Sequence, residues 1–246
     1  MAKPRVRPSR RRKVGAGGRA IRLMWQAFAL VVLATIIFSA WLWVDMRGWR
    51  PAETLYPEQG AVIRSGASGT KFETLKALGA QFVYLELAPS SVPPDPGFAA
   101  RLAAAREAGL KVGIAYPFEL CRRADPQSAR FTRMVARDEE LLPPALVLMI
   151  GRTPCTPPVS DAAVESELTT LINQVEMHAG KPVLLKPGQA FERKYRVASR
   201  MERDLWLVRD RAEPDYAGRP WLLWSANRGL FTEASTDPIE WVVVQE

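Results

Sequence analysis

An apolar stretch from Ala27 to Val44 most constrains what this chain can fold into. Its 18 residues approach the roughly 20 that an α-helix needs to cross a bilayer. Tryptophans mark both ends, with Trp25 just before the stretch and Trp41 and Trp43 close to its end. Amphipathic rings favour the membrane interface at such places. The stretch therefore predicts a transmembrane helix, with the remaining residues forming a separate domain.

A cleavable signal peptide is the competing interpretation of this stretch. Its apolar region would cover only about 7–15 residues and would end at a site of small residues. Here the stretch ends in Trp-Leu-Trp-Val-Asp at positions 41–45, which offers no such site. We therefore interpret residues 24–44 as an uncleaved transmembrane anchor.

Basic residues are concentrated before the anchor. Residues 1–23 hold nine of the chain's 34 lysines and arginines and no acidic residue. Because flanking positive charge stays in the cytoplasm, we predict a basic cytoplasmic tail over residues 1–23. The predicted location is the inner (cytoplasmic) membrane, crossed once, with the remainder of the chain in the periplasm or outside the cell.

The exported part carries no excess of positive charge. Subtracting the nine basic residues of the tail from 34 leaves 25 against 26 acidic residues, so the net charge of +8 belongs to the tail. Binding to nucleic acid requires a basic surface, and we expect no nucleic acid as a partner. The basic residues between Lys186 and Arg203 most simply form a solvated surface, with acidic wall polymer or a partner protein as the alternative.

After a short linker at residues 45–55, residues 56–246 are enough for one α/β domain with a real core. Cys121 and Cys155 both lie in this exported domain, where a disulfide is permitted, although sequence alone does not establish that they pair. No cluster of Cys and His suggests a metal site, and we expect no cofactor. The single histidine, His178, precedes Gly180 at a predicted helix end and is interpreted as structural.

Short apolar segments alternate with helical patterns along this domain. Repeated βα units favour a parallel sheet, and late strands with little helix between them favour an irregular TIM-like (β/α) barrel. A Ser/Thr-x-x-Glu pattern at Thr70 and an Asp-Pro pair at Asp95 predict the starts of two helices, and Ser160 predicts a third. The predicted strands are residues 60–63, 82–87, 111–116, 145–150, 182–185, 205–208, 221–224 and 239–244.

Several short motifs share the order and spacing of a known family. They are Tyr-Pro-Glu-Gln-Gly at 56–60, Gly-Ala-Gln-Phe-Val-Tyr at 79–84, Asp-Pro-Gly-Phe at 95–98, Ala-Gly-Leu-Lys-Val-Gly at 108–113 with Tyr116, Leu-Pro-Pro-Ala at 142–145, and Asn-Arg-Gly at 227–229. From Tyr56 to about Val244 the chain resembles the lysozymes of glycoside hydrolase family 25. The resemblance implies an irregular (β/α) barrel with its active site at the carboxyl ends of the strands, and peptidoglycan or a wall-associated protein as the partner.

The sequence departs from this family where the resemblance implies catalytic acids. Val62 stands where the first-strand Asp is expected, and Val147 and Met149 replace the Asp-x-Glu pair of the fourth strand. A further family pattern, Lys-x-Thr-Glu, becomes Glu-Leu-Ala-Pro at 86–89, and the family His after the third-strand Tyr becomes Pro117. Because Val and Met cannot transfer protons, loss of a general acid alone costs about 10²–10⁴ in rate.

Three hypotheses follow. The first is a pseudoenzyme, a catalytically degenerate lysozyme-like domain that binds glycan or scaffolds wall proteins. The second is an active muramidase with relocated carboxylates, for which Glu86, Glu119 and Glu240 are the candidates; Glu240 also matches the last family acid. The third is a protein-interaction barrel with a closed apolar cleft and no glycan binding.

Aromatic residues on the predicted strands are candidates for stacking on sugar rings. Tyr84, Tyr116 and Trp224 are the three that we expect near the cleft. Taken singly, each aromatic residue on a barrel strand is more often part of the core.

Overall fold

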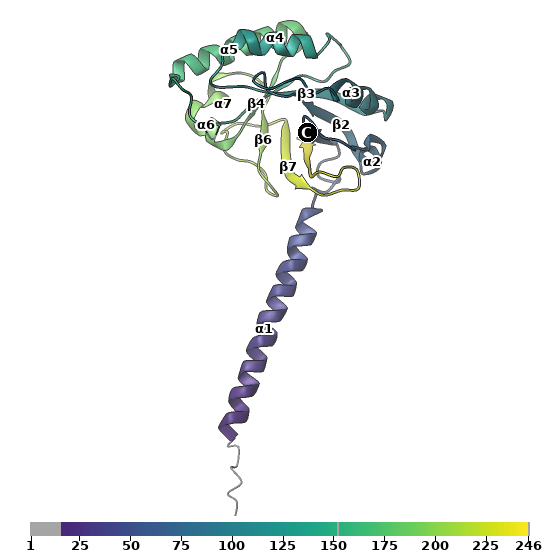
Figure 1. Cartoon of the computed structure of the whole chain (residues 1–246), viewed down its shortest axis with the longest axis vertical. Helices are drawn as coiled ribbons and strands as arrows, with labels where there is room; N and C mark the ends of the chain where they lie inside the picture. The colour runs from purple at the N-terminus through teal and green to yellow at the C-terminus, as the bar shows by residue number, and fades with distance from the viewer. Residues whose placement is uncertain (1–15, 152, 246) are drawn as a thin grey trace, which may run out of the picture. The chain divides into compact units, whose positions relative to one another are not determined.

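The computed structural model describes residues 16–151 and 153–245, and the chain divides into two compact units, Met1–Met46 and Arg47–Glu246. The described part of the first unit is helical and belongs to α1 (Ala16–Arg47) (Figure 1). Within α1, the segment Ile21–Arg47 has the length and composition of a membrane span, and an 18-residue window within it has a mean hydropathy of 2.4. The predicted anchor, residues 24–44, lies inside this segment, whereas most of the predicted basic tail lies outside the described residues.

The second unit is built on one sheet of eight strands in the order β5-β4-β3-β2-β1-β8-β7-β6. Strands β1 to β5 are parallel, β6 and β7 are parallel, and β8 is antiparallel to both of its neighbours. A parallel bridge between Leu185 and Leu205 brings the two edges together, so the sheet curls into a nearly closed barrel. The predicted irregular barrel is therefore confirmed. The strands are β1 (Gln59–Ile63), β2 (Ala80–Glu86), β3 (Lys111–Pro117), β4 (Ala145–Leu148), β5 (Leu184–Pro187), β6 (Trp206–Val208), β7 (Leu223–Leu230) and β8 (Ile239–Val244).

The helices of this unit pack around the outside of the barrel (Figure 1). The predicted cap of α5 is confirmed, since the Ser160 hydroxyl accepts a hydrogen bond from the Ala163 N–H at 3.2 Å. The helix ends at Gly180, whose φ of 69° suits a residue without Cβ. The helices are α2 (Phe72–Ala77), α3 (Phe98–Glu107), α4 (Ala124–Met134), α5 (Asp161–Ala179), α6 (Gln189–Tyr195) and α7 (Val197–Arg200).

Two of the predicted helix starts are wrong. Helix α2 begins at Phe72 without a side-chain cap, so Thr70 does not form the predicted capping box. Helix α3 begins at Phe98, three residues after Asp95. The carboxylate of Asp95 accepts the Gly97 N–H at 2.9 Å but also binds groups from another loop. Short α6 and α7 were not predicted.

Alternation along the strands creates two separate apolar layers. One set of side chains faces the helices and forms the larger core, and the opposite set fills the barrel interior. Gly60 and Gly113 leave room in this interior for the rings of Phe82 and Tyr84, respectively. The buried interior residues are Val62, Phe82, Tyr84, Ala115, Ala145, Leu184, Trp206, Leu223 and Val242.

The segment predicted as a linker packs against the barrel from Arg47 onward. The Phe231 N–H donates to the Arg47 carbonyl at 3.2 Å, and the Asn227 side chain donates to the Trp49 carbonyl at 2.9 Å. The Gln59 side chain donates to the Pro51 carbonyl at 3.1 Å. This part of the chain is therefore an ordered strap of the barrel unit.

Replacing Gly113 by Ala should destabilise the barrel, because the added Cβ would collide with the Tyr84 ring. Overpacking of this kind costs about 1–3 kcal/mol. Urea unfolding of the full chain in detergent measures the change. Gly151→Ala is the matched control, since its Cβ would meet its nearest neighbour at 3.7 Å. Equal unfolding midpoints for the two variants would contradict the packing described here.

Candidate functional site

The carboxyl ends of the parallel strands form one mouth of the barrel, where enzymes of this architecture keep their chemistry. Every second side chain of each strand points into the barrel, and this alternation continues from the apolar interior to the mouth. Strand β8 is antiparallel, so its beginning lies at the same end, and Glu240 stands opposite Val62 in the register of β1 and β8. The inward positions at this level are Val62, Glu86, Pro117, Val147, Lys186 and Glu240.

The three positions expected to hold catalytic acids carry apolar groups in or beside this mouth. Val62 is 3% exposed and belongs to the interior layer. Val147 is half-buried and packs against the same layer. Met149 follows the end of β4, is 41% exposed, and its thioether lies against Gly188. None of these side chains can donate or accept a proton.

A charged cluster lies among the interior side chains instead. The Lys186 ammonium forms an ion pair with the Glu240 carboxylate, and the Ser225 hydroxyl donates to the same carboxylate. The Trp206 indole N–H donates to the Ser225 oxygen at 2.8 Å, and the Lys186 nitrogen lies 4.0 Å from the centre of the Trp206 ring. Each buried polar group thus has a partner, as the cost of burying charge requires.

The sequence interpretation of Lys186 as part of a solvated surface is therefore wrong. Its side chain is 5% exposed and points into the barrel from β5. The predicted fifth strand stopped at residue 185, whereas β5 extends through Lys186 to Pro187. The prediction of strands from apolar residues alone left Lys186 out. Its burial is stabilised by the ion pair with Glu240 of β8, which lies 54 residues later in the chain.

Glu86 is the second carboxylate of this cluster. Burial raises the pKa of Glu86; the charge of Lys186 lowers it, and that of Glu240 raises it. The cluster therefore joins two of the three candidate acids, one with a pKa raised by burial and one paired with a cation.

Two surface cavities lie at this end of the barrel, and neither is lined by Glu86, Lys186 or Glu240. One, of about 250 Å³, is lined by residues 62–67, at the end of β1 and just after it, and by residues 235 and 237–239 before and within β8. The other, of about 680 Å³, lies beside the segments that follow β3 and β4. The charged cluster is therefore set inside the barrel rather than on the wall of either cavity.

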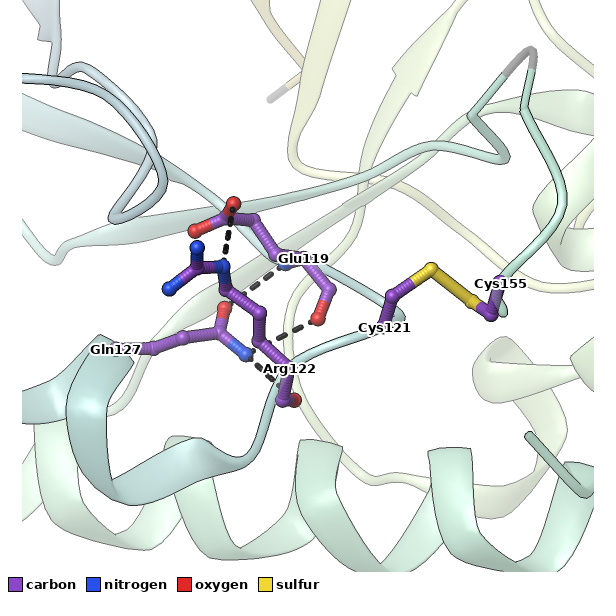
Figure 2. Close-up of a disulfide and its surroundings, with 5 residues drawn as sticks. All are labelled: Glu119, Cys121, Arg122, Gln127 and Cys155. Atoms are coloured by element: carbon purple, nitrogen blue, oxygen red, sulfur yellow. Dashed lines mark hydrogen bonds and ion pairs between the residues drawn. A yellow bond between two sulfur atoms is a disulfide. The ribbon is translucent and has the colours of Figure 1, made fainter. Parts of the chain in front are cut away.

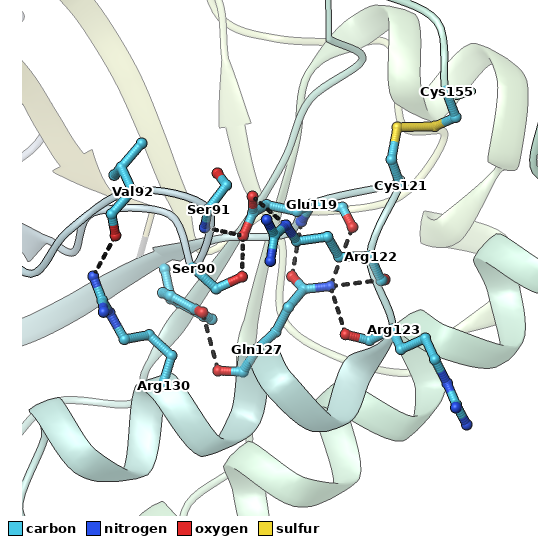
Figure 3. A network of polar contacts seen from close by, with 11 residues as sticks. Ser90, Ser91, Val92, Glu119, Cys121, Arg122, Arg123, Gln127, Arg130 and Cys155 are labelled. Atoms are coloured by element: carbon cyan, nitrogen blue, oxygen red, sulfur yellow. Dashed lines mark hydrogen bonds and ion pairs between the residues drawn. A yellow bond between two sulfur atoms is a disulfide. The ribbon is translucent and has the colours of Figure 1, made fainter. Parts of the chain in front are cut away.

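The third candidate acid, Glu119, is used to hold loops together. Its carboxylate accepts hydrogen bonds from the Ser90 hydroxyl and from the Ser91 N–H at 3.2 Å, and forms an ion pair with Arg122 at 3.5 Å (Figure 3). Its backbone N–H donates to the Gln127 side chain at 2.8 Å (Figure 2). Glu119 lines the 680 Å³ cavity but does not join Glu86 and Glu240.

Cys121 and Cys155 form a disulfide beside this polar network (Figure 2). The bond joins the loop after β3 to the loop after β4, across a sequence separation of 34. Both cysteines line the 680 Å³ cavity, so the disulfide holds one of its walls in place.

The three aromatic candidates for glycan binding are core residues. Tyr84 is buried in the barrel interior and donates its hydroxyl to the Pro143 carbonyl at 3.0 Å. Tyr116 is buried on the opposite, helix-facing side. Trp224 is 3% exposed, and its indole N–H donates to the Arg209 carbonyl at 2.7 Å. None of the three offers a free ring face at the mouth.

Asp95 fixes the loop that encloses the 250 Å³ cavity. Its carboxylate accepts the Gly66 N–H at 2.6 Å and the Ser65 hydroxyl at 3.3 Å, and it forms an ion pair with Arg101. Burial by itself raises the pKa of Asp95, but the hydrogen bonds from Arg101, Gly66 and Gly97 outweigh it and lower the pKa to about 2. The sequence identified this residue only as a helix cap.

The sequence model described as Glycosyl hydrolases family 25 matches residues 63–227. The chain belongs to glycosyl hydrolase family 25. No curated protein sequence matches it.

Solved structures of the same family share the fold of this member. A family 25 glycosyl hydrolase from Bacillus anthracis superposes with a TM-score of 0.72 at 20% identity, covering 80% of this chain and 92% of that one. A bacterial lysozyme from Streptomyces coelicolor gives 0.68 at 14% identity, covering 77% and 92%. A family 25 lysozyme from Aspergillus fumigatus gives 0.63 at 16% identity, covering 77% and 94%.

Replacing Glu240 by Gln should destabilise this family 25 barrel strongly, because Lys186 would stay buried without its counter-charge. Breaking a buried pair in this way costs about 3–5 kcal/mol. The double variant K186M/E240Q removes both charges and should recover most of the lost unfolding free energy. Glu165→Gln, which removes an exposed ion pair with Arg200, is the control and should change stability little. An E240Q variant as stable as the natural chain would contradict this account.

Replacing Asp95 by Asn should weaken the loop beside the 250 Å³ cavity in a pH-dependent way. A folded-state pKa of about 2, below the usual 3.8, stabilises the fold above pH 4. That contribution, at most about 2 kcal/mol, is lost as the pH falls from 4 to 2. Urea unfolding at pH 7, 5 and 3 should show the difference between the natural chain and D95N shrinking at the lowest pH. A difference independent of pH would refute this role.

Proposed function

We propose that this chain is a membrane-anchored family 25 domain that binds peptidoglycan without cleaving it. The observation that carries the proposal is the chemistry of the mouth, where Val62, Val147 and Met149 occupy the positions expected to transfer protons. The retained acid, Glu240, is paired with Lys186 and Ser225 inside the barrel. A domain of this kind keeps the shape of a glycan-binding fold without its acid–base groups.

The proposed setting is the outer side of the cytoplasmic (inner) membrane. The apolar segment Ile21–Arg47 supports a single span, and the basic residues before it support a cytoplasmic N-terminus. The disulfide between Cys121 and Cys155 supports an oxidising compartment for the barrel, in the periplasm or outside the cell. Peptidoglycan or a protein of the wall is then the available partner.

A second candidate function, an active muramidase with relocated acids, is favoured by one observation. Glu86, whose pKa is raised by burial, shares the cluster with Glu240. In this version Glu86 would be the proton donor and Glu240 the ionised carboxylate. The ion pair with Lys186 argues against it, because the carboxylate is already neutralised.

Sedimentation of the full chain in detergent with insoluble peptidoglycan tests the binding function. We expect the protein to pellet with peptidoglycan and to stay in solution with cellulose, the matched polysaccharide control. A protein-interaction barrel would stay in solution with both polymers, and that result would remove the proposed function.

Restoring the three acids tests whether their absence explains the lack of cleavage. We expect a zymogram of the full chain to show no clearing, and the V62D/V147D/M149E variant to show weak clearing if it folds. Circular dichroism and the unfolding midpoint serve as folding controls. Clearing by the natural chain that disappears in E86Q would favour the relocated-acid enzyme.

A further inference from the structure

The 680 Å³ cavity beside the segments after β3 and β4 is lined mainly by apolar groups. Met149 and Ile150 line it and are 41% and 44% exposed. Further apolar lining comes from Pro89, Pro117, Leu120, Pro154, Pro158 and Val159. Because apolar surface gains free energy when it leaves water, the cavity suits a ligand that carries apolar side chains.

The size and the walls of this cavity suit a short chain molecule. Cavities of about 300–1,000 Å³ hold ligands of the size of a drug molecule, and a short peptide of small residues is of this size. The disulfide joins the loops after β3 and β4, and Glu119 binds Ser90 and Ser91 of the loop after β2 (Figure 3). Walls that are already held in place reduce the entropy cost of binding.

The segment after β4 offers backbone hydrogen-bonding groups to such a ligand. Strand β4 ends at Leu148, whose carbonyl accepts the Gly188 N–H at 2.9 Å. Within the part of the chain that the structure describes, the backbone groups of the next three residues, Met149, Ile150 and Gly151, make no hydrogen bond. An extended peptide laid along these residues can pair with their N–H and C=O groups.

The charged groups of the cavity favour an anionic ligand. The described lining residues include two cations, Arg122 and Lys194, and one carboxylate, that of Glu119. Arg122 pairs with Glu119 at 3.5 Å, and Lys194 pairs with Asp161 at 3.1 Å. The two cationic side chains are 45% and 48% exposed, and ion pairs at such exposed positions are weak. Both cations can therefore exchange their partner for a carboxylate of the ligand.

The aromatic residues of the cavity are poorly placed to stack on a sugar ring. Phe118 is 5% exposed and belongs to the larger core. The Tyr195 ring already contacts Phe191, with 4.6 Å between the ring centres, and the Lys194 nitrogen lies 4.8 Å from its centre. The described lining thus offers aliphatic side chains and backbone groups in place of an open aromatic ring.

We propose that this cavity binds the peptide stem of peptidoglycan and leaves the sugar backbone outside. The inference rests on the proposed function, the binding of peptidoglycan, and names the part of the polymer that is recognised. Peptide stems are short, carry small apolar side chains and free carboxylates, and present amide N–H and C=O groups. These properties match the apolar lining, the two cations and the backbone of residues 149–151.

Competition in the sedimentation assay tests this assignment with the full chain in detergent. An amidase cuts peptidoglycan into soluble stem peptides and soluble glycan strands, and each is added to the chain mixed with insoluble peptidoglycan. We expect the stems to release the chain from the pellet at concentrations at least tenfold lower than the glycan strands require. Release by the glycan strands alone, or by neither competitor, would overturn the assignment. A chain that does not pellet before any competitor is added would instead remove the proposed function.

Replacing Ile150 by Asp tests the cavity itself, because the new carboxylate repels the carboxylates of the stem and removes an apolar contact. We expect the affinity for peptidoglycan to fall about tenfold. Phe231→Asp is the matched control, since Phe231 is 49% exposed, follows β7 and lines neither cavity at the mouth. Circular dichroism confirms that both variants fold. Unchanged affinity in I150D, or an equal loss in both variants, would contradict binding in this cavity.

Discussion

The ion pair between Lys186 and Glu240 is the interaction on which the interior of this barrel depends. It joins β5 to β8, which have four other strands between them in the sheet order, across the space that the barrel encloses. Ser225 and Trp206 extend it by hydrogen bonds to β7 and β6. A buried lysine is tolerated only with such partners, so the cluster and the closure of the sheet depend on each other.

This cluster also lies at the end of the barrel where enzymes of this architecture have their active site. Val62, Val147 and Met149 place apolar groups in or beside the mouth, and Lys186 forms an ion pair with Glu240. Glu86 keeps a raised pKa through burial but lines neither cavity at the mouth. The fold of the family is thus kept around an apolar interior and one charged cluster.

Much of the fold could be predicted from the sequence, because strand and helix periodicities are local. The apolar runs at residues 82–87 and 111–116 coincide closely with β2 and β3, and Ser160 caps α5 as expected. The errors concern side chains whose hydrogen-bond or ion-pair partners lie far away in the sequence. Asp95 was predicted only as a helix cap, because its hydrogen bond with the Gly66 N–H comes from another loop. Lys186 was predicted to be solvated, because its partner Glu240 lies 54 residues later in the chain.

The contacts of the candidate site could not be predicted from the sequence. Motif positions alone predict that Val62, Val147 and Met149 stand where the family's acids are expected, whereas the burial of Tyr116 and Trp224 depends on which face of each strand meets the helices. The most direct measurement of the central claim is the release of soluble muropeptides from purified peptidoglycan by the full chain, followed by mass spectrometry from pH 4 to 8. The account predicts release no greater than with buffer alone. Sustained release that is abolished by E86Q or E240Q in a folded variant would contradict it.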